Sequence, residues 1–325
     1  MALRTLFILN PASRRGADRF GRLAASLKKA LGEIEVVRTR APLDAVRLAR
    51  EAARGGFGRI VVGGGDGTLS EVATGVLEAG LGSQVEIGLI PLGSGCDFAR
   101  SVGVPEHVEQ AIAQLRDGES RIVDAGCLTR RTEQGVEQKR YFLNESGFGL
   151  SGMTVELVRQ AGKRFGPRTA FAVGTVRAIA RGGIPEVELR VDGQVVHEGG
   201  VALVVCGNGR YFGSGMRIAP EAVLNDGQFD LIVVSALGRA KLLSRFPSLY
   251  RGTHLRYPEV RTYRGGCIEA KWLGGGPARC EADGEPLGLL PIRWEICPGA
   301  LRIAGLAEPP APAWGGRGFG LNVSA

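Results

Sequence analysis

The feature that constrains this chain most is a run of glycines around one acidic residue, Gly-Gly-Gly-Asp-Gly at 63–67. An apolar run at 60–62 precedes it and predicts a short buried strand, while Thr68 predicts the cap of a helix over 69–79. Glycine has no side chain, so the backbone N–H groups of such a loop can approach a ligand closely. The helix dipole favours an anion at this position. The loop is therefore predicted to bind a phosphate.

The Asp66 carboxylate indicates that a metal ion also binds at this loop. A bare carboxylate beside phosphates is repulsive unless Mg²⁺ lies between them. The alternative is an ordinary glycine-rich turn with Asp66 as a turn residue. A second stretch, 87–101, repeats the plan of an apolar strand, a small-residue loop, an acidic residue and a helix, which favours a pair of related loops.

Strands and helices alternate from residue 3 to about 124. The expected strands are 3–9, 34–38, 59–62 and 86–90, and the expected helices are 17–31, 43–54, 68–79, 97–101 and 106–116. This alternation predicts a doubly wound, mostly parallel, three-layer α/β domain over 1–124. Ligands on such sheets bind beyond the carboxyl ends of the strands, where Asn10, Thr39 and both glycine-rich loops fall.

After residue 125 the pattern changes to short strands separated by turns. The expected strands are 121–128, 139–145, 186–191, 200–206, 229–234, 259–262, 266–271, 279–282 and 291–297, with helices at 150–161, 168–181 and 238–250. A β-rich second domain is predicted over 125–305. The Pro/Gly-rich segment 306–325 is predicted to be a disordered tail.

The two glycine-rich stretches resemble the catalytic domain of the diacylglycerol kinase family, which includes bacterial lipid kinases and the sphingosine and ceramide kinases. The resemblance extends in the family's order to Leu9-Asn10-Pro11, to 213–230 and to 281–287, so it covers nearly the whole chain. One position departs from the family pattern. Where the family usually has Thr-Gly-Asn-Asp, this chain has Ser-Gly-Cys-Asp, so Ser94 keeps a hydroxyl while Cys96 loses an amide.

The resemblance implies an ATP- and Mg²⁺-dependent lipid kinase whose second domain is a β-sandwich that holds the lipid acceptor. The implied nucleotide-binding residues are Asn10, Thr39, Gly64, Gly65, Asp66, Gly67, Thr68, Gly93 and Ser94. The carboxylates implied to hold the catalytic Mg²⁺, partly through water, are those of Asp66, Asp97 and Asp124. The residues alone leave Asp97 open to a role as helix cap and Asp124 to that of a strand end.

Two further sites follow from the same resemblance. The loop 223–228 is similar to a structural Mg²⁺ loop, with the Asp226 carboxylate and the backbone carbonyls of Val223 and Gln228 as ligands. Glu285 is implied as the general base on the lipid hydroxyl, with Asp283 as the substitute, although Asp-Gly is also a common hairpin turn. An alcohol is a very weak acid, so this carboxylate need only accept the proton late in a loose transition state.

A glycine pattern at 147–152 fits the dinucleotide-binding fingerprint. No Asp or Glu follows at the distance of about 20 residues that ribose recognition needs. We therefore expect this segment to line the acceptor pocket. The chain has no Walker-type Gly-Lys-Ser/Thr, which excludes ordinary P-loop enzymes.

The net charge of +8 suits an anionic partner. Basic residues gather at 159–181 and 239–256 among apolar ones, which fits either an anionic membrane surface or a solvated basic face. No nucleic-acid-binding motif is present. Without an apolar run long enough to span a bilayer, the chain is expected to be cytoplasmic and peripheral to the inner face of the membrane. The six cysteines are scattered and are expected to be free structural thiols, and a homodimer is left open.

Two other functions compete with the lipid kinase. NAD kinase also uses Gly-Gly-Asp-Gly, but the Asp-Gly-Glu at 283–285 and the Pro-Leu-Gly-Ser-Gly loop favour the lipid kinase. The substitution at Cys96 motivates a lipid- or nucleotide-binding protein without activity. The sequence does not choose among diacylglycerol, sphingosine, ceramide and phosphatidylglycerol as acceptor.

Overall fold

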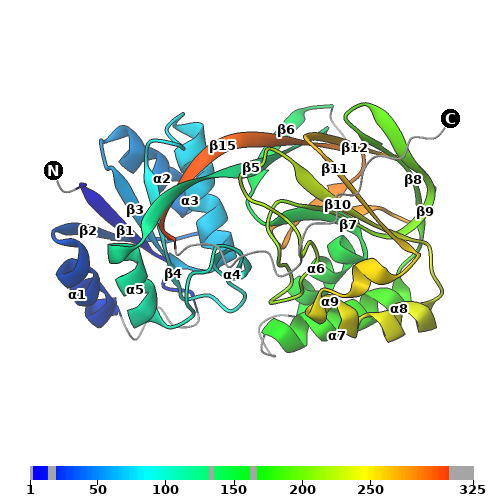
Figure 1. The fold of residues 1–325 in the computed structure, drawn as a ribbon, viewed down its shortest axis with the longest axis horizontal. Coiled ribbons are helices and arrows are strands. Elements are labelled where there is room, and N and C mark those ends of the chain that lie inside the picture. The colour runs from blue at the N-terminus through cyan, green and yellow to red at the C-terminus, as the bar shows by residue number, and fades with distance from the viewer. Residues whose placement is uncertain (1–2, 14–19, 132–134, 162–166, 307–325) are drawn as a thin grey trace.

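A computed structural model describes residues 3–13, 20–131, 135–161 and 167–306. Two domains lie side by side (Figure 1). The predicted tail, apart from residue 306, lies outside the described residues, as do the first residues of the helix expected over 17–31.

The first domain is built on a parallel sheet with the strand order β4-β3-β1-β2. Its strands are β1 (Thr5–Leu9), β2 (Ile34–Arg38), β3 (Arg59–Gly64) and β4 (Glu86–Pro91). Its helices are α1 (Phe20–Leu31), α2 (Asp44–Arg54), α3 (Asp66–Glu78), α4 (Asp97–Ser101) and α5 (Val108–Asp117). Helices α2 and α3 cover one face, and α1 and α5 cover the other (Figure 1). The predicted three-layer α/β domain is confirmed.

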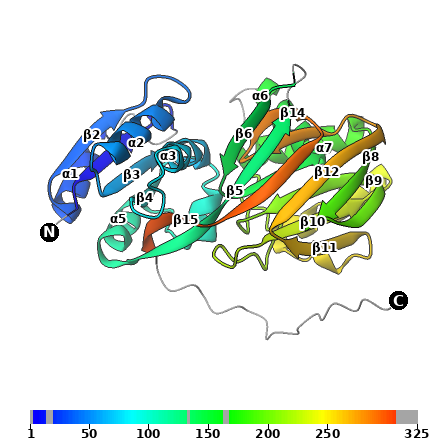
Figure 2. The same cartoon turned by 90° about the horizontal axis from the view of Figure 1, so that it is seen from above.

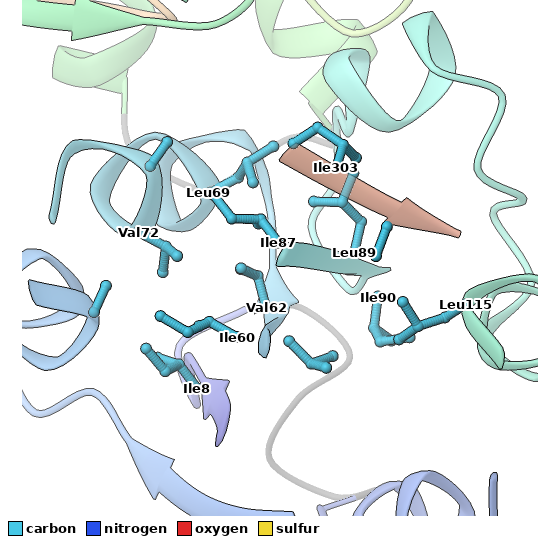
Figure 3. Packing of buried hydrophobic residues seen from close by; sticks show 14 of the residues in the cluster. Ile8, Ile60, Val62, Leu69, Val72, Ile87, Leu89, Ile90, Leu115 and Ile303 are labelled. Carbon is cyan, nitrogen blue, oxygen red and sulfur yellow. The ribbon is translucent and has the colours of Figure 1, made fainter. Parts of the chain in front are cut away.

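Apolar strands with both faces covered hold this domain together. Every residue of β1 is buried, as expected for a parallel sheet between two helix layers. In Figure 3, Ile87 of β4 lies next to Leu69 of α3, and Ile60 of β3 lies nearer to Val72 of the same helix. Each such side chain contributes about 1.5–3 kcal/mol on burial. The core therefore fixes the carboxyl ends of the strands, from which the glycine-rich loops emerge.

The second domain is a two-layered sandwich of mostly antiparallel strands. One layer has the order β6-β5-β15-β12-β8 and the other β14-β13-β7-β9-β10-β11, with β9 also pairing with β8. The strands are β5 (Glu119–Arg131), β6 (Glu137–Phe142), β7 (Glu145–Gly149), β8 (Pro185–Val191), β9 (Gln194–Gly207), β10 (Phe229–Ser235), β11 (Val260–Gly265), β12 (Cys267–Gly275), β13 (Arg279–Ala282), β14 (Glu285–Leu289) and β15 (Ile292–Leu306).

Alternation along the strands sends side chains to two different cores. In β10, Phe229, Leu231 and Val233 fill the space between the two layers. Ile232, on the opposite face of the same strand, belongs to a smaller core with Leu203 of β9. Helices α6 (Leu150–Ala161), α7 (Pro167–Arg181), α8 (Arg239–Arg245) and α9 (Pro247–Arg251) lie together below this sandwich (Figure 1).

Two long strands join the domains. β5 and β15 pair antiparallel and run from one domain into the other (Figure 2). The end of β15 pairs parallel to β4, with Ile303 beside Ile87. Leu301 and Ile303, which the sequence prediction placed in the second domain, therefore pack in the core of the first.

The predicted end of this last strand at 297 was wrong. A Pro-Gly pair such as Pro298-Gly299 usually interrupts a strand. Here the pairing of β15 with β5 shifts register between Cys297 and Leu301 and then resumes. The helix predicted over 238–250 is instead divided into α8 and α9, because Pro247 opens a new helix. All six cysteines are free thiols. Among the described residues, no helix has the length and apolar character needed to cross a membrane.

The packing of α2 on α3 yields a stability prediction. A Cβ on Gly75 of α3 would lie 2.3 Å from the Val46 carbonyl oxygen of α2. Gly75→Ala is therefore expected to lower the free energy of unfolding by about 1–3 kcal/mol, measured by urea denaturation. Gly21→Ala in α1 is the matched control, because nothing lies within 4 Å of that Cβ. Equal stability of the two variants would contradict this packing.

Candidate active site

The two glycine-rich loops are in direct backbone contact. The Gly93 N–H donates to the Gly64 carbonyl oxygen at 3.0 Å. A Cβ on Gly93 would lie 2.3 Å from the Gly65 Cα, closer than any side chain tolerates. The glycines are therefore needed for the loops to meet, which places both at one edge of the sheet.

Helix α3 begins at Asp66, earlier than predicted, and Gly65 takes the cap position. The prediction that Thr68 caps this helix was wrong, since Thr68 lies inside it. A missing Cβ on Gly64 leaves room for the Thr68 side chain, whose hydroxyl accepts a hydrogen bond from Asn10 Nδ2 at 2.9 Å. The N–H groups of the first helical turn have no partner within the helix, and Gly67 there is exposed. This turn can hold a phosphate.

Thr39 lies at the same edge of the sheet. Its N–H donates to the Leu9 carbonyl oxygen at 3.0 Å, and its side chain is buried. Thr39 thus follows β2 as Asn10 follows β1, and both lie at the carboxyl ends of their strands. Their predicted contacts with the nucleotide stay predictions.

The Asp66 carboxylate caps helix α4. It accepts hydrogen bonds from the backbone N–H groups of Asp97 at 3.1 Å and Phe98 at 3.0 Å. Asp66, from the first glycine-rich loop, therefore holds the helix that follows the second loop. The side-chain amide of Asn144, which belongs to the second domain, lies 3.4 Å from the same carboxylate.

Asp97 is the first residue of α4 rather than its cap. Its carboxylate accepts the Ser214 N–H at 2.7 Å and pairs with Arg100 at 2.5 Å. Burial, and then the nearby Asp66 carboxylate, raise the pKa of Asp97 to about 6.

The carboxylates of Asp66 and Asp97 both lie on the side of Gly95 from which a side chain would project. A Cβ on Gly95 would lie 3.1 Å from Asp66 Oδ2 and 3.8 Å from Asp97 Oδ2. Carboxylate oxygens are ligands that Mg²⁺ prefers, but the oxygens of both residues accept hydrogen bonds here. The predicted metal role of Asp66 and Asp97 stays a prediction.

Asp283 supplies the acidic group of the second domain. It lies in a left-handed turn between β13 and β14, with φ of 46°. Its carboxylate accepts the N–H groups of Leu143 at 2.8 Å, Asn144 at 2.9 Å and Glu145 at 3.3 Å. Loss of water around this carboxylate raises its pKa to about 6, although the three donors act in the opposite direction.

Asn144 connects Asp283 to Asp66, and sequence reasoning missed it. Its backbone binds one aspartate and its side chain approaches the other. Its signal in the sequence was a place three residues before the glycine pattern at 147–152. Leu150 and Ser151 of that pattern line the cavity described below, and the expectation that the segment lines an acceptor pocket stays a prediction.

Glu285 lies outside the group of residues formed by Asp66, Asp97, Asn144 and Asp283. It is the first residue of β14, opposite Ala282 across the two-residue turn, and its side chain is exposed. The turn folds Asp283 inward and leaves Glu285 outside the lining of the cavity described below. The predicted role of Glu285 as general base stays a prediction, and the substitute, Asp283, is the residue that the structure places at the site.

The Asp124 carboxylate has backbone partners of its own, and its predicted role in the metal site stays a prediction. Its buried carboxylate accepts the backbone N–H groups of Gly227 at 2.8 Å and Gly299 at 2.7 Å. Each carboxylate oxygen accepts one of these two hydrogen bonds. The structure thus gives Asp124 a role in fixing the loop 223–228 beside β15.

The predicted structural Mg²⁺ loop carries an ion pair. Asp226 pairs with Arg264 and accepts the Gln228 N–H, while Val223 is exposed. Arg264 supplies the positive charge that a cation would otherwise bring. Within the described ranges, no group of three or more His, Cys, Asp or Glu side chains could hold a metal ion. Since the predicted set uses one carboxylate and two carbonyls, it stays a prediction.

A cavity of about 360 Å³ is lined by Asp66, Asp97 and Asp283. Its polar end is lined by both domains through Gly65, Asp66, Gly67, Ser94, Asp97, Asn144 and Asp283. Its other end is mostly apolar and lies between α6, α7 and α8 and the outer face of β9, although Arg245 and Glu259 also line the cavity. The apolar lining includes Val155, Phe171, Ile179, Leu203, Leu242 and Phe246.

Comparisons with known proteins agree with this arrangement. Residues 4–128 match the diacylglycerol kinase catalytic domain, and residues 147–305 match the YegS C-terminal NAD kinase beta sandwich-like domain. The "probable lipid kinase YegS-like" protein of Klebsiella pneumoniae is 31% identical over 264 residues, covering 80% of this chain and 82% of that protein. The diacylglycerol kinase of Mycobacterium tuberculosis is 27% identical over 300 residues, covering 91% and 93%.

A solved structure shares the fold. A crystal structure from Bacillus anthracis, described as that of a diacylglycerol kinase, has a TM-score of 0.68 and 21% identity, covering 93% of this chain and 96% of that one. The two domain matches follow one another along nearly the whole chain. The protein therefore belongs to the diacylglycerol kinase catalytic-domain family, together with the YegS-like lipid kinases.

Proposed function

We propose that this protein transfers the γ-phosphoryl group of ATP to a hydroxyl group of diacylglycerol or a related lipid. The observation that carries the proposal is a single cavity with two unlike ends. Acidic and glycine-rich elements form one end, and apolar helices form the other. A cavity that joins a polar end to an apolar end can bring a charged phosphate donor and an apolar alcohol together.

The polar end supplies what phosphoryl transfer needs from a protein. The first turn of α3 offers N–H groups to the phosphates, and Ser94 offers a hydroxyl from the second loop. Asp66 and Asp97 would hold Mg²⁺, which neutralises charge on the phosphates when it is bound. Both loops are fixed by backbone contacts, so they orient the donor without rearranging.

The apolar end supports a lipid acceptor over NAD. Phe171, Thr175 and Ile179, spaced four residues apart on α7, all face the cavity. NAD carries charged phosphates on both of its nucleotides, and Arg245 is the single Lys or Arg among the residues that line the cavity, so most of the wall offers these phosphates no partner. A hydrocarbon chain gains free energy from the same wall.

The outer faces of the cavity helices support a membrane partner. On α7, Val173 and Val176 are exposed beside Arg177 and Arg181. Leu243 of α8 is also exposed. Apolar side chains flanked by arginines suit the interface of an anionic bilayer. A lipid could then enter the cavity while its chains stay partly in the membrane.

Removal of the Asp66 carboxylate tests the catalytic assignment. Asp66→Ala is expected to lower kcat for lipid phosphorylation by about 100-fold or more, because α4 loses its cap and the phosphates lose their metal-facing carboxylate. Labelled ATP and mixed micelles of diacylglycerol provide the assay. Asp117→Ala, an exposed aspartate at the end of α5, is the control. Equal kcat for both folded variants would discard this site.

Loss of two arginines tests the membrane face. Arg177→Ala with Arg181→Ala is expected to weaken binding to phosphatidylglycerol vesicles by about 30-fold, from about 1 kcal/mol for each charge. Vesicle sedimentation at fixed salt measures the change. The control pair, Arg54→Ala with Arg116→Ala, removes exposed charges from the first domain. A similar loss in both pairs would indicate a general charge effect and contradict a specific face.

A further inference from the structure

Arg245 of α8 lies at the end of the cavity remote from the glycine-rich loops. Glu145, which lines the polar end, is in register with Asp230 near the start of β10, through one residue of β9. Further along β10, the Ser235 N–H donates to the carbonyl oxygen of Glu259, the neighbour of Arg245. A strand rises about 3.4 Å per residue, so the two positions on β10 lie about 17 Å apart. Arg245 is therefore well separated from the phosphate-binding turn.

Two cations share one carboxylate at this end. Lys241, one helical turn before Arg245, donates to Glu259 Oε1 at 3.0 Å, whereas Arg245 Nη2 lies 3.6 Å from the same oxygen. Over 237–260, Glu259 is the single acidic residue, against five arginines and lysines. The group of three side chains therefore carries one excess positive charge, which favours an anionic ligand.

An aromatic ring orients the Arg245 guanidinium. Its Cζ lies 3.4 Å from the centroid of the Tyr257 ring, and both residues line the cavity. The ring covers one face of the planar group and leaves the N–H groups at its edge. Among the described residues, none accepts a hydrogen bond from these N–H groups. The side chain is 27% exposed, so a ligand can reach it from outside.

We propose that Arg245, with Lys241, binds the phosphate group of an anionic phospholipid of the membrane. The inference rests on the proposed function and adds a phosphate-binding position at the end of the cavity remote from Asp66. A phosphodiester offers two oxygens to the planar N–H groups of arginine, a geometry that lysine does not reproduce. The apolar lining beside Arg245, and Leu243 on the same helix at 43% exposed, favour a lipid over a free phosphate. Bound in this way, the protein presents the apolar end of the cavity to the bilayer that supplies the acceptor.

Vesicle binding by the full-length protein is the first test. Arg245→Lys keeps the charge but loses the planar group, so we expect about 10-fold weaker binding to phosphatidylglycerol vesicles, close to the loss in Arg245→Gln. Arg251→Lys is the matched control, because Arg251 is exposed on α9 and is not among the residues that line the cavity. Its binding should stay within about twofold of wild type, since only the charge matters there. Wild-type binding in Arg245→Lys would overturn the proposal.

Soluble lipids provide a second test, measured by isothermal titration calorimetry below the concentration at which they form micelles. Arg245→Gln should bind dihexanoyl phosphatidylglycerol about 10-fold more weakly than wild type, and dihexanoylglycerol, which has no phosphate, within about threefold of it. Equal weakening for both lipids would indicate a distorted cavity and overturn the proposal. Inorganic phosphate that binds wild type as tightly as the phospholipid would also overturn it.

Failure of the proposed function has a different signature. A wild-type protein that phosphorylates no lipid, yet binds the phospholipid in a manner that depends on Arg245, would refute the kinase activity and support the phosphate site. Lipid phosphorylation without any effect of Arg245 on phospholipid binding would support the kinase and refute the phosphate site.

Discussion

The hydrogen bonds from the start of α4 to the Asp66 carboxylate hold the candidate site together. They join two loops that come from different strands, and they place two like charges, Asp66 and Asp97, beside one another. Such a pair is stable only where positive groups surround it. The α4 N-terminus, Arg100 and the Ser214 N–H provide that surrounding, and a divalent cation would complete it.

The two domains form one site because two strands, rather than a flexible linker, connect them. β5 and β15 pair along the crossing, and the end of β15 is part of the first core. The buried Asp124 carboxylate holds two backbone N–H groups beside this crossing. A cavity with walls from both domains can therefore keep its shape, and Asn144 can reach from Asp283 to Asp66.

The sequence predicted the parts of this structure that depend on local patterns. Apolar runs ending in glycine gave the strands and both loops, and the order of motifs gave the family. What it missed depends on contacts between distant residues. The continuation of β15 past Pro298-Gly299 is possible only because β5 lies alongside. The inward position of Asp283 and the outward position of Glu285 follow from a turn whose direction the sequence does not state. Glu145 and Glu281 are 136 residues apart in the printed sequence and meet only when β7 pairs with β13.

We propose that one cavity brings a phosphate donor and an apolar alcohol together. The most direct measurement is to incubate the purified protein with γ-labelled ATP, Mg²⁺, a total lipid extract and NAD, and to identify the labelled product by chromatography and mass spectrometry. The account predicts label in a phosphorylated lipid that is soluble in organic solvent. Label in NADP, or only in free inorganic phosphate, would contradict it.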